Sequence, residues 1–207
     1  MGIDGGSMDE HADGDTRERR DSSTNTDSDR VLVTKRAIFH ALYELMEERD
    51  FAKLTVGDII ERAGVSRSTF YRCFEDKYDV VNWSFKRFKN IRIQDRDQYY
   101  SFESSLRVML RYLAEHRRYF AHALRYTGQS SLRDFMYETN VEYMAQCWSE
   151  EHGDRLDYGT RAMIQFAGAG MSKIVERWVL DGCEQEVEDV AAAIESLVPQ
   201  PLFDVLY

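Results

Sequence analysis

From Val31 onward, apolar residues recur three and four positions apart, which is the spacing of one face of an α-helix. The first run places Ile38, Leu42 and Leu45 on one face and ends near Asp50. Similar runs continue to the end of the chain, and two Pro and twelve Gly leave room for long uninterrupted helices. The pattern therefore predicts an all-α protein.

Three helix starts follow one another after the first helix. Thr55 has the chemistry of an N-cap residue, and Asp58, three positions later, completes a capping-box pattern. Ser66 and Asp76 are N-cap candidates for the next two helices, and Gly64 can take the left-handed conformation that ends the first of them. Two short helices joined by a tight turn containing Gly predict a helix-turn-helix.

The predicted organisation has four parts. Residues 1 to 29 contain almost no apolar side chains, so we expect a disordered acidic tail. A three-helix DNA-binding domain then covers residues 30 to 76, a connecting helix covers 77 to 97, and an effector and dimerisation domain covers 98 to 207. In the last part we expect helices from Phe102 to His116, Arg117 to Tyr126, Ser131 to Glu151, Tyr158 to Asp181 and Glu186 to Leu197.

The net charge of −10 is unevenly distributed. Residues 30 to 97 carry a net charge of +3, whereas the segments before and after carry −6 and −7. A basic segment in an acidic chain is typical of a DNA-binding module attached to an acidic body, although an excess of three charges also arises by chance.

Other chemistry is sparse. Cys73, Cys147 and Cys183 lack metal-ligand spacing, so we interpret them as reduced thiols and expect no metal and no cofactor. No nucleophile motif or phosphate loop is present, which argues against an enzyme. Without a membrane-spanning run or a signal peptide, a cytoplasmic protein with no membrane partner is expected.

The helix beginning at Ser66 carries the candidate chemistry. If Phe70 and Phe74 turn into the core, the outward face holds two guanidinium groups, hydroxyls and a phenol. These outward residues are Arg67, Ser68, Thr69, Tyr71 and Arg72. Such donors suit phosphates and base edges in the major groove of double-stranded DNA, while the alternative is an ordinary solvated helix face.

The stretch from Leu54 to Lys77, with Ala63-Gly64-Val65-Ser66 and Thr69-Phe70-Tyr71 in register, resembles the DNA-binding signature of the TetR family. The resemblance covers residues 31 to 90 and implies a homodimeric regulator, most often a repressor, on a palindromic operator. It further implies that Thr55 and Lys77 bind phosphate, that Ser66, Arg67, Ser68 and Arg72 lie in or beside the groove, and that Tyr71 contacts the backbone. Cys73 and Val80 depart from the usual pattern.

The helix from Tyr158 to Asp181 is apolar over much of its circumference, so it needs packing partners on two sides. We favour a four-helix dimer interface built with the following helix, and the alternative is a buried core helix in a monomer. The candidate interface residues are Gly170, Ile174, Trp178, Val190, Ile194 and Leu197.

The sequence does not identify the effector of the second domain. The end section weakly resembles the TetR-type subgroup that includes regulators of dihydroxyacetone kinase, some of which work through a protein partner rather than a small ligand. An alternative reading is therefore a coactivator or interaction module controlled by a protein. Candidate ligand-pocket residues, each also spaced like a plain core residue, are Met109, Leu113, Phe120, Phe135, Met144, Trp148 and Phe166.

Overall fold

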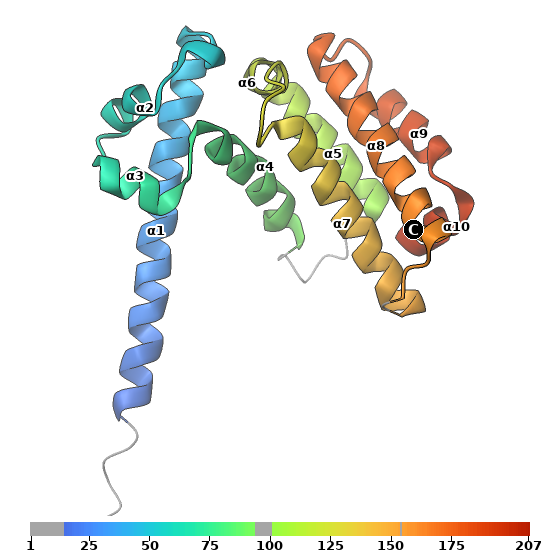
Figure 1. The fold of residues 1–207 in the computed structure, drawn as a ribbon, viewed down its shortest axis with the longest axis horizontal. Helices are drawn as coiled ribbons and strands as arrows, with labels where there is room; N and C mark the ends of the chain where they lie inside the picture. Colours follow the sequence, from blue (N-terminus) through green and yellow to red (C-terminus); the bar gives the residue numbers. More distant parts are fainter. Residues whose placement is uncertain (1–14, 94–100, 154) are drawn as a thin grey trace, which may run out of the picture.

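A computed structural model describes residues 15–93, 101–153 and 155–207, and these residues form α-helices and one short 3-10 helix, with no strand among them (Figure 1). The predicted all-α class is confirmed. The elements in chain order are α1 Asp15–Glu48, η1 Phe51–Lys53, α2 Val56–Ala63, α3 Arg67–Cys73, α4 Lys77–Ile93, α5 Phe102–Glu115, α6 Arg117–Leu124, α7 Leu132–His152, α8 Tyr158–Leu180, α9 Val187–Leu197 and α10 Gln200–Leu206.

Helices α1, α2 and α3 form the predicted helix-turn-helix domain. Its core contains Ile38 and Leu42 of α1, Ile59 of α2 and Phe70 of α3, each with no exposed surface. Gly64 ends α2 with φ of 63°, a left-handed conformation that favours glycine. The chain can therefore turn within a few residues and start α3.

The first helix differs from the prediction at its beginning. We expected a disordered tail over residues 1 to 29, but α1 begins at Asp15. No Gly or Pro interrupts residues 15 to 48, and a helix anchored by buried Ile38 and Leu42 gains one hydrogen bond for each residue by which it lengthens. Residues 1 to 14 lie outside the described residues.

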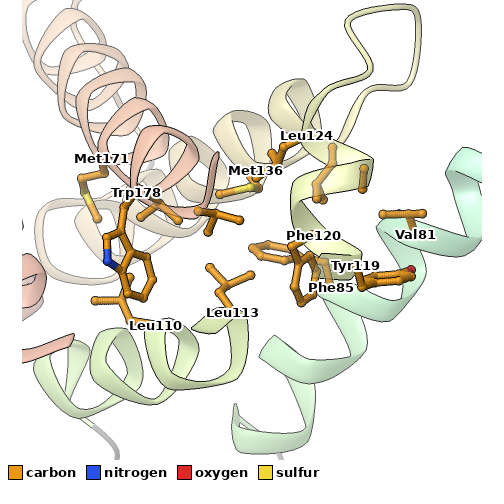
Figure 2. Packing of buried hydrophobic residues seen from close by; sticks show 14 of the residues in the cluster. Val81, Phe85, Leu110, Leu113, Tyr119, Phe120, Leu124, Met136, Met171 and Trp178 are labelled. Atoms are coloured by element: carbon orange, nitrogen blue, oxygen red, sulfur yellow. The ribbon is translucent and has the colours of Figure 1, made fainter. Parts of the chain in front are cut away.

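Helices α5 to α10 form the second domain, in which α7 and α8 lie side by side (Figure 1). Gly168 permits this approach, since a Cβ atom at that position would lie 2.7 Å from a methyl group of Val141. Trp178 of α8 is buried with Leu110 and Leu113 of α5 nearby, as Figure 2 shows. We expected the last helix to end at Leu197, and α10 was not predicted.

The two domains share a packed junction between α1 and α6. Tyr119 of α6 is completely buried, and its ring stacks on that of Tyr43 of α1 at 5.3 Å between centroids. The Tyr43 hydroxyl and Nδ1 of His116 share a hydrogen bond of 3.0 Å. Nearby, the rings of Tyr78 on α4 and Tyr126 after α6 stack at 3.9 Å. The first domain is therefore held against the second by side chains of α1 and α4.

In the part of the chain that the structure describes, no helix is both long enough and apolar enough to cross a membrane.

Candidate nucleic-acid interface

Helix α3 is fixed in place by its cap and its buried face. Ser66 accepts a hydrogen bond from the backbone N–H of Thr69 at 3.1 Å, as the cap prediction requires. Phe70 and Phe74 are buried as predicted, and they anchor the helix to α1 and α4. The opposite face of the helix is consequently held toward solvent.

The solvent face of α3 carries the predicted donors. Arg67, Ser68, Tyr71 and Arg72 are exposed, whereas Thr69 is half-buried. The guanidinium carbon of Arg67 lies 5.6 Å from the centre of the Tyr71 ring, one helical turn away, and this contact limits the conformations of both side chains. Two guanidinium groups on one short exposed helix can pair with guanine edges or with phosphates.

The hydroxyl groups near the start of α3 bond to one another. Ser66 Oγ shares hydrogen bonds with the hydroxyls of Ser68 at 2.9 Å and of Thr69 at 2.8 Å. Binding to DNA through these hydroxyls would require rearrangement of this small network. Their predicted position in or beside the groove stays a prediction.

Thr55 forms the predicted capping box at the start of α2. Its hydroxyl donates to Asp58 Oδ2 at 2.6 Å and accepts from the Asp58 backbone N–H at 3.2 Å. Hydrogen bonds from the side chain and backbone of Thr55, with Arg49 nearby, lower the pKa of Asp58 to about 2. The hydroxyl proton of Thr55 is therefore engaged within the protein, and the predicted phosphate contact would need it to turn.

Lys77 occupies a different place from the one the family resemblance implies. Only 8% of its surface is exposed, and Nζ donates to the backbone carbonyls of Phe51 at 2.8 Å, Leu54 at 2.7 Å and Ala52 at 3.4 Å. Burial lowers the pKa of Lys77. The phosphate-binding interpretation is corrected here, because the ammonium group is turned inward and joins α4 to the connection between α1 and α2.

The start of α4 is capped by its own side chains. Asp76 Oδ1 accepts from the backbone N–H groups of Tyr78 and Asp79, both at 2.8 Å, as the predicted N-cap requires. The Asp79 carboxylate instead accepts from the N–H of Glu75 at 3.1 Å. Two backbone donors at the start of α4 are thus already bound within the protein. Cys73, at the position where the family usually has His or Tyr, is buried and offers no contact.

The seven candidate pocket residues differ widely in burial. Leu113, Phe120 and Met144 are packed in the core of the second domain, and Met109 and Phe135 pack against that core. Trp148 stacks on His152 of its own helix at 4.3 Å between ring centroids. Phe166 is 72% exposed, so its assignment to the pocket is corrected. Spacing alone could not tell which face of α8 turns inward.

The six candidate interface residues divide into two groups. Trp178, Val190 and Ile194 are buried within their own protomer, and this part of the prediction is corrected because α8 and α9 pack on each other and on α5. Gly170 and Leu197 are exposed, and Ile174 is half-buried. Ile174 also lines an open groove of about 430 Å³ between α8 and α9.

A helix-turn-helix with a donor-rich exposed third helix, joined to a second helical domain, defines the class of DNA-binding transcriptional regulators. The family model described as "Bacterial regulatory proteins, tetR family" matches residues 38–82. A second, described as "Transcriptional regulator C-terminal region", matches residues 89–200. The chain therefore belongs to the TetR family, a family of regulators and not of enzymes.

Individual relatives agree with this assignment. The chain is 30% identical over 86 residues to DhaS, the dhaKLM operon transcriptional activator of Lactococcus lactis, in an alignment covering 42% of this chain and 46% of DhaS. It is 42% identical over 52 residues to the regulator YdeS of Bacillus subtilis, covering 25% of this chain and 26% of YdeS. The matched segments thus span less than half the length of either curated relative.

Two solved structures share the fold. The dihydroxyacetone kinase operon activator DhaS matches with a TM-score of 0.60 and 18% identity, covering 84% of this chain and 98% of that one. A TetR transcriptional regulator from Streptococcus agalactiae matches with a TM-score of 0.55 and 24% identity over the same shares of the two chains.

Proposed function

We propose that this regulator binds a palindromic operator as a homodimer and reads base edges with the exposed face of α3. The observation that carries the proposal is the pair of guanidinium groups of Arg67 and Arg72, presented to solvent by a helix whose other face is buried. One short recognition helix buries too little surface for high specificity, so two copies are needed.

The second copy docks on α8 and α9. Phe166 is 72% exposed and Leu197 is 63% exposed, which is unusual for large apolar side chains. Gly170 lies between them in sequence, and a Cβ atom there would meet nothing within 4 Å. An apolar face with a small residue allows close approach of the same two helices from a second copy, and together they would form a four-helix interface.

The second domain modulates DNA binding through its contacts with α1 and α4. Asn82 on α4 donates to the backbone carbonyl of Ser130, in the loop between α6 and α7, at 3.1 Å. The Tyr43 to His116 hydrogen bond makes a parallel connection from α1. A shift of α6 or of this loop would therefore move the helices that hold α3.

Repression is the simplest consequence of operator binding, since a bound dimer occupies the promoter. A second candidate is activation under the control of a protein partner rather than a small ligand. Two observations favour it: the relative DhaS is named an operon activator, and three of the proposed pocket residues, Leu113, Phe120 and Met144, are buried core side chains.

Selection of bound duplexes from a random pool tests the proposal. We expect an inverted repeat whose half-sites lie about 34–36 Å apart, or a multiple of that distance. Recovery of only direct repeats or single asymmetric sites would argue against a two-fold dimer. Sedimentation should also show that Phe166→Arg yields monomers. Val33→Arg, at another highly exposed apolar residue on α1, should leave the dimer intact.

A reporter gene behind the selected operator then gives the sign of regulation. Lower expression with the protein present supports repression, and higher expression supports activation. A metabolite that raises the melting temperature progressively, with the logarithm of its concentration above its dissociation constant, identifies a small effector. Control by a partner is supported if no metabolite has this effect and a specific protein is retained from native lysate. The purified partner must also change the affinity of the regulator for its operator.

A further inference from the structure

Three cationic side chains gather where α1 crosses α4. Lys35 Nζ lies 4.9 Å from the centre of the Phe74 ring and 6.0 Å from that of Trp83. The guanidinium carbon of Arg87 lies 5.6 Å from the same Trp83 ring. Arg36 follows Lys35 on α1 and is exposed. We call Lys35, Arg36 and Arg87 the α1–α4 cationic row.

Among the side chains that the structure describes, no acidic group pairs with this row. None of its three members has an ion-pair partner within residues 15–93, 101–153 and 155–207. Other arginines nearby are paired: Arg62 lies 2.9 Å from the Glu48 carboxylate, and Arg118 lies 2.9 Å from that of Glu47.

The cations also disfavour one another. Burial, and then the positive charge of Arg36, lower the pKa of Arg87. The aromatic contacts of Lys35 and Arg87 are attractive and oppose this repulsion. An anion placed against the row would relieve this repulsion, so the arrangement is better suited to a bound state than to the free protein.

The row continues from the end of the recognition helix. Phe74 is the C-cap residue of α3, and Lys35 lies over its ring. A duplex whose major groove receives α3 carries phosphates along both edges of that groove. The edge next to the C-terminal end of α3 therefore passes beside Lys35, and the strand can follow the seam between α1 and α4.

We propose that the α1–α4 cationic row binds the phosphate backbone of duplex DNA beside the groove read by α3. The proposal rests on the proposed function, because it takes α3 to be the base-reading helix. It adds sequence-independent contacts on helices outside the helix-turn-helix pair, and it supplies the electrostatic attraction that the capped helix starts and the inward-turned Lys77 do not.

The test measures full-length protein binding to two duplexes, one selected from a random pool and one of scrambled sequence, over a range of salt concentrations. We expect Lys35→Gln, Arg36→Gln and Arg87→Gln each to weaken binding to both duplexes by the same factor. Each should also reduce the slope of log affinity against log salt by about 0.9. Lys35→Arg should keep the slope, because the charge remains.

Arg155→Gln is the matched control, since Arg155 is exposed between α7 and α8 and its loss changes the net charge equally. The inference is overturned if the row variants, folded by circular dichroism, keep the salt slope of Arg155→Gln. It is also overturned if they weaken only the selected duplex, because that pattern indicates base reading.

The two proposals fail separately. If selection returns no preferred sequence, the proposed operator recognition fails, but the scrambled duplex still reports on phosphate contacts. If a preferred inverted repeat is found and the row variants bind both duplexes like wild type, only the cationic row is refuted.

Discussion

Replacing Lys77 with Met removes the ammonium group that joins α4 to the connection between α1 and α2. Two of its hydrogen bonds are short, at 2.8 Å to the Phe51 carbonyl and 2.7 Å to that of Leu54. A hydrogen bond involving a charged group contributes about 1.5 kcal/mol or more, so the free energy of unfolding should fall by about 3 kcal/mol. Methionine keeps most of the packing of the stem. At roughly 2–4 °C per kcal/mol for a chain of this size, the melting temperature should fall by roughly 6–12 °C.

Thermal unfolding followed by circular dichroism measures this loss, and Lys53→Met is the control because Lys53 lies exposed in η1. Operator binding of folded Lys77→Met should keep the wild-type salt slope, since the ammonium group is buried. The reasoning is refuted if Lys77→Met is as stable as Lys53→Met and its salt slope falls by about one. That result would mean that Nζ reaches a phosphate, as the family resemblance implies.

Three further results are expected. Arg67→Ala or Arg72→Ala should change which bases are preferred in selection from a random pool, and equal loss on every operator variant would contradict a base-reading role. The pKa of Asp58 is about 2 in the folded protein against an ordinary 3.8, so its contribution to stability is present above pH 4 and is lost as the pH falls through 2. In urea unfolding, wild type should therefore lose stability over that pH window more steeply than Asp58→Asn. Parallel curves of stability against pH for the two proteins would exclude this cause. Gly168→Ala places a Cβ atom 2.7 Å from a valine methyl group of α7 and should lower the free energy of unfolding by about 1–3 kcal/mol. Gly170→Ala is the control, because its Cβ atom meets no atom of its own protomer within 4 Å. Equal stability of the two variants would mean that α7 and α8 are not tightly packed at Gly168.

The helix starts were predictable because their chemistry is local. Thr55, Ser66 and Asp76 each bond backbone N–H groups two or three residues further along the chain, so the residues that make the contact are adjacent in the sequence. Gly64 likewise acts through its own backbone conformation. Once these ends were placed, the apolar spacing located the helix-turn-helix and its exposed face.

The side-chain roles that failed depend on distant partners. Lys77 finds its acceptors 23 to 26 residues earlier in the chain, and no local pattern reports that the ammonium group turns inward. On α8, Trp178 and Phe166 are both large apolar residues, but contacts with α5 and α7 decide that the first is buried and the second exposed. Helix α10 was not predicted from the sequence, although the Pro199 carbonyl accepts the first hydrogen bonds of this helix, from the N–H groups of Leu202 and Phe203.

The shared junction of α1 and α6 makes the two domains inseparable. Tyr119 of the second domain is buried against Phe39 and Tyr43 of α1, and its hydroxyl shares a hydrogen bond with Ser84 of α4. A fragment cut after α4 would expose the rings of Phe39 and Tyr43 to water, so we expect it to be less soluble than the full chain. Exchange of effector domains between related regulators, by a designer or by recombination, would succeed only where the donor brings an α6 surface matched to this α1. The unit to keep together is therefore the helix-turn-helix domain with the α6 surface that contacts it.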